Sequence, residues 1–128
     1  NILYSKAYGD IGFLMDHGTW MTQLRKGALD AAVLGVLARE RRLYGLALLD
    51  RLNAAGLGVT EGALYPLLAR LEKAEVLAAS WVMEDGASHP RKYYTLTPAG
   101  IGLLAQMRPS WDAFSAQVTD LMKERSQS

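Results

Sequence analysis

Apolar residues in the first half of the chain recur at the spacing of α-helices. The pattern predicts a first helix from Leu24 to Ala38 and a second from Tyr44 to about Ala55. A third helix follows a short glycine-containing turn and starts at Thr60, because threonine is a good N-cap. The expected buried stripe of the second helix is Leu46, Leu49 and Leu52. The third helix is expected to bury leucines at i, i+3, i+4 and i+7: Leu64, Leu67, Leu68 and Leu71.

The pattern changes to strand character after the third helix. Val76 to Met83 is rich in valine, leucine and tryptophan, residues 84–90 are turn formers, and Arg91 to Leu96 predicts a return strand. Neighbouring strand residues point to opposite faces, so Tyr94, in phase with Leu96, is predicted to point inward. A helix-turn-helix followed by such a hairpin, or wing, is typical of a winged helix.

The last predicted helix carries a heptad seam. Thr97 is a suitable N-cap and Pro98 suits the first helical position. The apolar spacings then alternate between three and four residues, which predicts packing against a second copy of the chain. The expected dimer interface is Leu104, Met107, Trp111, Phe114, Val118 and Leu121. Pro109 predicts a kink in this helix.

These elements predict a mainly α-helical fold with a small β-hairpin: a winged helix-turn-helix with a C-terminal dimerisation helix. The expected DNA-binding domain spans residues 21–97 and the dimerisation helix residues 98–128. Residues 1–20 show no clear period and are interpreted as a leader or tag-like extension. The alternative is that they form an additional segment packed on the dimer.

Composition excludes several classes of function. The 128 residues contain no cysteine, which excludes a disulfide scaffold and a cysteine nucleophile and fits a cytoplasmic protein. His17 and His89 are the two histidines, and neither has another histidine at ligand spacing. No metal, cofactor or enzymatic activity is therefore expected. The longest apolar run of the first 20 residues, Ile11 to Met15, is too short to span a membrane.

The charge pattern limits any claim of DNA binding. Net charge is +1, and residues 60–92 contain four basic and five acidic residues. Phosphate contacts must then come from a few placed cations and helix ends. Glu72 is expected to pair with a nearby arginine or lysine. Pro66 breaks the local rule for a helix interior, which marks either a functional site or an irregular first turn.

Several motifs resemble those of the PadR family of bacterial transcriptional regulators. They are L-R-K-G at 24–27, Y-G at 44–45, E-G-x-L-Y-P-L-L-x-R-L-E at 61–72, Trp81, and R-K-Y-Y-x-L-T-x-x-G at 91–100. The resemblance covers about residues 24–122. It implies a homodimer that binds double-stranded DNA at an inverted repeat. It also implies a set of DNA-binding residues: Thr60, Glu61, Gly62, Tyr65, Pro66, Lys73, Arg91 and Lys92.

The resemblance also implies a small-molecule effector. In one multidrug-binding branch with similarly short C-terminal arms, a tryptophan on the last helix stacks flat aromatic ligands at the dimer interface. Trp111 is similar in placement, and Met107 and Phe114 would be neighbouring wall residues. The leading hypothesis is a repressor released by a small aromatic or hydrophobic effector. One alternative is a winged helix that binds protein rather than DNA, which the near-neutral charge of the region allows, and another is an enzyme, which no motif supports. For the single residues, the alternatives are that Tyr65 is a partly buried core tyrosine and that Arg91 and Lys92 are a solvated strand start.

Overall fold

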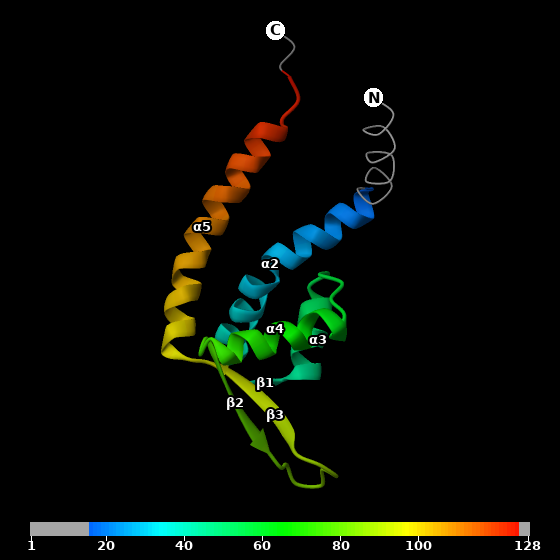
Figure 1. Ribbon diagram of the computed structural model, residues 1–128, viewed down its shortest axis with the longest axis vertical. Coiled ribbons are helices and arrows are strands. Elements are labelled where there is room, and N and C mark those ends of the chain that lie inside the picture. The colour runs from blue at the N-terminus through cyan, green and yellow to red at the C-terminus, as the bar shows by residue number, and fades with distance from the viewer. Residues whose placement is uncertain (1–15, 126–128) are drawn as a thin grey trace, which may run out of the picture.

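The computed structural model of the chain describes residues 16–125 and has a helical body from which a wing and a long arm extend (Figure 1). The elements in chain order are α2 (His17–Glu40), β1 (Leu43–Tyr44), α3 (Gly45–Ala54), α4 (Glu61–Lys73), β2 (Leu77–Val82), β3 (Arg91–Leu96) and α5 (Pro98–Met122). The predicted winged helix-turn-helix followed by a long C-terminal helix is confirmed. Each expected helix and both expected strands are present.

The sheet has three strands in the order β1-β3-β2, one more than expected. β3 is central and antiparallel to both neighbours, with Leu43 opposite Tyr94 and Tyr44 opposite Tyr93. β1 has only two residues, so it offers no alternation from which a strand is recognised. Its position ties the start of α3 to the base of the wing.

The core lies where α2, α3, α4 and the sheet meet. Its fully buried side chains are Val33, Leu34, Leu37, Leu48, Leu52, Leu64, Leu68 and Leu77. The predicted leucine stripe of α4 is confirmed, and Tyr94 belongs to the core as expected. The predicted stripe of α3 is wrong at Leu46, which is 50% exposed, whereas Leu48 is fully buried. Leu48 and Leu52 lie one turn apart on the inner side of α3, and Leu46 lies on another side.

α2 begins earlier than the pattern indicated. Asp16 is its N-cap, and the Asp16 carboxylate accepts a hydrogen bond of 2.8 Å from the Thr19 amide. This bond lowers the pKa of Asp16. The expected boundary at residue 20 therefore falls inside α2, and residues 1–15 lie outside the described part of the chain. No helix between residues 16 and 125 is long and apolar enough to cross a membrane.

The base of α5 is fixed to the body by a joint between Thr97 and the start of β2. The Thr97 hydroxyl donates to the Glu75 carbonyl at 2.6 Å, and the Thr97 amide donates to the Val76 carbonyl at 3.1 Å. The Thr97 oxygen also accepts from the Gly100 amide at 3.0 Å, which confirms the predicted N-cap. A Cβ at Gly100 would lie 2.3 Å from the Val76 carbonyl oxygen, so only glycine permits this approach.

Beyond its first turns, α5 leaves the body as an arm (Figure 1). Leu104 is 5% exposed and belongs to the core of the protomer. Its predicted place in the dimer interface stays a prediction. Phe114 and Leu121, further along the arm, are 63% and 85% exposed. α5 is one continuous helix through Pro109, which therefore does not end it.

Candidate nucleic-acid interface

The outer side of α4 presents the residues predicted to face DNA. Thr60 caps the helix, since its hydroxyl oxygen accepts from the Ala63 amide at 3.2 Å. The expected set on this side is exposed without exception: Thr60, Glu61, Gly62, Tyr65 and Pro66. The buried leucines hold the opposite side of the helix against the core, so α4 can present this surface to a partner.

Tyr65 lies against the start of α3 rather than in the core. A Cβ built at Gly45 would lie 2.6 Å from Cε1 and 2.9 Å from the hydroxyl oxygen of Tyr65. Tyr65 is 37% exposed, and its partial burial raises the pKa of the phenol. Tyr65 is therefore oriented by the α3 backbone while part of its ring remains accessible.

The turn between α3 and α4 has a defined conformation. Gly56 and Gly58 adopt positive φ angles of 91° and 64°, which favour glycine. The Asn53 side chain then binds Val59 twice: its amide donates to the Val59 carbonyl at 2.9 Å, and its oxygen accepts from the Val59 amide at 2.6 Å. These bonds fix where α4 starts relative to α3.

Pro66 lies inside α4, which is helical from Glu61 to Lys73, so the alternative of an irregular first turn does not account for it. Proline lacks the amide that would bind the Gly62 carbonyl, four residues earlier. Both residues are exposed, so water or a ligand donor can satisfy that carbonyl. The break in helix rules therefore lies on the surface predicted to meet DNA.

Lys92 is paired within the protein. Its ammonium donates to the Glu72 carboxylate at 2.8 Å and lies 5.6 Å from the centre of the Tyr94 ring. The hydrogen bond to Glu72 raises the pKa of Lys92. The expected pairing of Glu72 with a nearby cation is confirmed. The same ion pair fixes the wing to α4 and reduces the charge that Lys92 offers to a phosphate.

Arg91 belongs to a ladder on the wing in which two adjacent tyrosine rings lie between two arginines. Arg91 lies 4.4 Å from the centre of the Tyr44 ring, and Arg42 lies 4.4 Å from that of Tyr93. The two tyrosines meet edge to face at 5.5 Å. Tyr93 also donates a hydrogen bond to Glu84, which raises the pKa of the phenol. The ladder covers Tyr93, so both neighbouring tyrosines of β3 are buried, on opposite faces.

Sequence reasoning missed Arg42 and Tyr44 as partners of the wing. Arg42 was visible only as one of several cations after α2, and Tyr44 only as part of a dipeptide motif. β1 places Tyr44 beside Tyr93, and Arg42, which directly precedes β1, lies over the Tyr93 ring, so both contacts depend on the unrecognised strand. Lys73, by contrast, is exposed at the end of α4 and makes no ion pair within residues 16–125.

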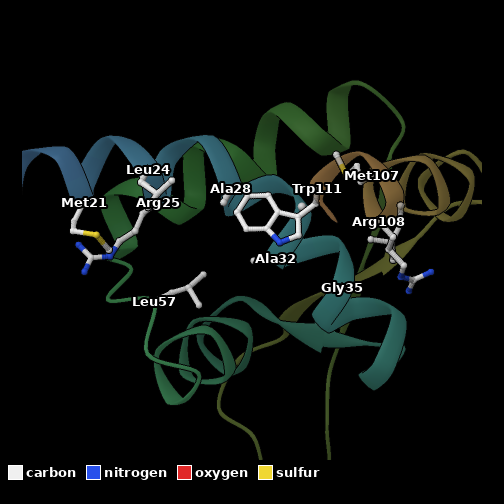
Figure 2. A pocket seen from close by; sticks show the side chains of 12 residues that line it. Met21, Leu24, Arg25, Ala28, Ala32, Gly35, Leu57, Met107, Arg108 and Trp111 are labelled. Carbon is white, nitrogen blue, oxygen red and sulfur yellow. The ribbon is translucent and has the colours of Figure 1, made fainter. Parts of the chain in front are cut away.

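A groove of about 460 Å³ lies between α2 and α5 (Figure 2). Two of the predicted effector-pocket residues, Met107 and Trp111, line it, whereas Phe114 lies outside the lining. Phe114 is one turn further along α5, where the arm has left the body. Leu57, from the turn between α3 and α4, also contributes to the lining. Residues 16–125 contain no cluster of acidic and histidine side chains that could hold a metal ion.

Two helices joined by a fixed turn, an exposed face on the second helix and a wing tied to it define a winged helix-turn-helix protein. Residues 33–106 match the family of "Transcriptional regulator PadR-like" proteins. The match spans more than half of the chain, so the chain belongs to the PadR-like family of transcriptional regulators, which are not enzymes. The predicted family resemblance is thereby confirmed.

Individual relatives agree with this assignment. The chain is 32% identical over 81 residues to the "Transcriptional regulator Rv3488" of Mycobacterium tuberculosis, covering 63% of this chain and 74% of that protein. A PadR family regulator from Eggerthella lenta matches with a TM-score of 0.71 and 34% identity over 94% of this chain and 99% of the other. A PadR-like regulator from Bacillus cereus has the same TM-score at 31% identity, over 80% and 99% of the two chains.

Proposed function

We propose that the protein is a sequence-specific repressor that binds DNA as a homodimer and is released by a small aromatic or hydrophobic effector. The ion pair between Lys92 and Glu72 carries the DNA-binding part of this proposal, because it holds the wing beside the exposed face of α4. A helix and a wing fixed in this way read one groove and grip the flanking phosphates at the same time. Such a role places the protein in the cytoplasm.

In this proposal α4 enters the major groove. Tyr65 contacts a phosphate or a thymine methyl group, while Glu61 accepts a hydrogen bond from a base amino group. The remaining helix contacts come from Thr60, Gly62 and Pro66. Lys73 and Arg91 lie near the phosphates, and Lys92 joins them once DNA competes for its ion pair with Glu72.

The dimer forms through the outer half of α5. Phe114, Val118 and Leu121 continue the heptad spacing past the body, and Phe114 and Leu121 are largely exposed. A second copy of α5 is the occupant that a heptad seam specifies. Two-fold symmetry then places two α4 helices about one DNA turn apart, so the operator is an inverted repeat.

The effector occupies the groove beside Met107 and Trp111. Its lining is almost entirely apolar, and the indole of Trp111 offers a flat surface for stacking (Figure 2). α5 forms one wall of this groove and also carries the dimer interface. A ligand there changes the separation of the two α4 helices and so shifts the population that fits the operator.

A protein partner in place of DNA is the second candidate function. Trp81 and Met83 are 68% and 59% exposed on the wing, and aromatic and methionine side chains are typical of protein interfaces. The pairing of Lys92 with Glu72 also lowers the positive charge available to DNA.

Fluorescence anisotropy on DNA from upstream of the protein's own gene, with a scrambled control and a salt series, separates the two functions. Preference for the upstream DNA together with a steep loss of affinity in salt supports the repressor, since phosphate contacts release counterions. Equal and weak binding to both DNAs that is insensitive to salt favours the protein partner.

A further inference from the structure

Arg25 on α2 lines both a groove and a separate cavity. The groove lies between α2 and α5, and the cavity of about 160 Å³ lies beside the start of α4. The guanidinium lies over the turn between α3 and α4: its carbon is 3.7 Å from the position that a Cβ of Gly58 would take. Gly58 and Thr60 line the second cavity with Arg25. One side chain therefore contacts both the groove and the segment where α4 begins.

The groove also reaches this turn directly. Leu57 forms part of its wall and stands between Gly56 and Gly58, the two glycines with positive φ (Figure 2). Two residues later, Val59 is bound by Asn53 on α3. A shift of Leu57 or of the Arg25 guanidinium therefore acts on the residues that set the position of Thr60 and α4.

The charges in the groove define a class of ligand. Its lining residues are otherwise uncharged, but Arg25 and Arg108 stand at its two ends (Figure 2). Within residues 16–125 neither guanidinium makes a hydrogen bond or ion pair. A guanidinium beside an apolar surface favours a ligand that combines a hydrophobic body with an anionic group, because charge-assisted hydrogen bonds to Arg are strong.

We propose that the groove binds apolar anions and that the anionic group pairs with Arg25, which draws the guanidinium away from the turn and repositions the start of α4. Arg25 is thus a positioning residue that connects ligand and DNA surfaces within one protomer. This inference rests on the proposed effector function but adds a route that does not require a change in dimer separation. Arg108 lies on α5, away from the turn, and has no such connection.

The ligand class and the route are tested with two probes of the same body. 8-Anilinonaphthalene-1-sulfonate carries an anionic group, and N-phenyl-1-naphthylamine lacks it. The sulfonate is expected to bind the full chain with a rise in fluorescence and to shift the backbone amide NMR signals of Gly58, Val59 and Thr60. The neutral probe, which can contact Leu57 but cannot pair with Arg25, is expected to bind with clearly smaller shifts of those signals. Equal shifts with both probes, or no binding of the sulfonate, would overturn the proposal.

Two matched variants then assign the role to one arginine. At saturating sulfonate, established from the fluorescence titration of each variant, Arg25→Gln is expected to show only the smaller shifts of the neutral probe and Arg108→Gln to retain the full shifts. Arg25→Lys keeps a cation and is expected to restore part of the shifts. Unchanged shifts in Arg25→Gln would overturn the role of Arg25, and loss of the shifts in both glutamine variants would show that the charges act without a specific path.

Operator affinity separates the inference from the proposed function. Saturating sulfonate is expected to weaken operator binding about 10-fold in the wild type and in Arg108→Gln, within the usual range of coupling between sites, and less than about 2-fold in Arg25→Gln. A wild type that shows amide shifts dependent on Arg25 but an unchanged operator affinity overturns effector control and leaves the assigned ligand contact intact. An equal response of wild type and Arg25→Gln overturns the inference and leaves effector control intact.

Discussion

The ring of Tyr65 occupies the space that a side chain at position 45 would fill. Gly45 opens α3, and the nearest atoms to a Cβ built there belong to the outer end of the Tyr65 ring, at 2.6 and 2.9 Å. The first helix of the helix-turn-helix therefore sets the direction of an exposed tyrosine on the second. Glycine at position 45 therefore allows the Tyr65 ring to pack closely against the start of α3.

Changing Gly45 to Ala is expected to reduce DNA affinity about 5–10-fold while costing less than about 1 kcal/mol of unfolding free energy, because a flexible side chain rather than backbone must move. Anisotropy on operator DNA and thermal unfolding measure the two quantities. Gly27→Ala, in a helix with open space around the position, is the matched control and should leave DNA affinity unchanged. A large loss of stability in Gly45→Ala would contradict this explanation.

Changing Glu72 to Gln is expected to increase DNA affinity about 2–5-fold at low salt and to steepen its salt dependence, since the charge of Lys92 becomes available to phosphate. The stability change should stay below about 1 kcal/mol, because the pair is about one-third exposed. Lys92→Met should have the opposite effect on affinity. If Glu72→Gln binds DNA no better than the wild type, Lys92 does not reach the phosphates.

Changing Gly100 to Ala is expected to destabilise the fold by about 2 kcal/mol, because the new Cβ would meet the Val76 carbonyl, which cannot turn aside. Denaturant unfolding measures this change. Gly102→Ala, two residues further along α5 in open space, should instead be neutral or slightly stabilising. Equal stability of the two variants would show that α5 shifts at its base without cost.

The combined change of Phe114 and Val118 to Asp is expected to yield monomers, since burying unpaired carboxylates at an interface is costly. Sedimentation analysis at several concentrations detects the change in mass. Ala116→Asp, on the other side of α5 from the heptad seam, is the control and should remain dimeric. A double variant that still dimerises would place the interface elsewhere.

The helices and strands with a periodic pattern could be predicted from the sequence, whereas most contacts between them could not. The leucines of α4 and the caps Thr60 and Thr97 follow local rules, which is why the starts of α4 and α5 were predicted correctly. β1 was missed because two residues carry no period. Leu46 shows a second limit, because it was predicted to be buried and is exposed in the structure. In a ten-residue helix with few polar residues, two leucine stripes fit the sequence equally well.

The same distinction between local patterns and contacts across the fold applies to the candidate site. The exposed face of α4 follows from helix geometry, so its residues could be predicted by number. The pairing of Lys92 with Glu72 was expected only in kind, and the stacking of Arg91 on Tyr44 was not expected, since both depend on how the sheet meets the helices. The position of Arg25 over Gly58 joins segments more than thirty residues apart, beyond the range of any local pattern.

The joint between Thr97 and the start of β2 also sets a limit on how such proteins can be recombined. The Thr97 hydroxyl and amide make three contacts with the carbonyls of Glu75 and Val76, and the close approach of Gly100 to Val76 completes the joint. A chimera that takes its arm from a relative therefore needs a crossover after Gly100, or both halves of the joint from the same parent. Crossovers inside the joint would combine an arm and a DNA-binding body whose relative orientation neither parent had specified.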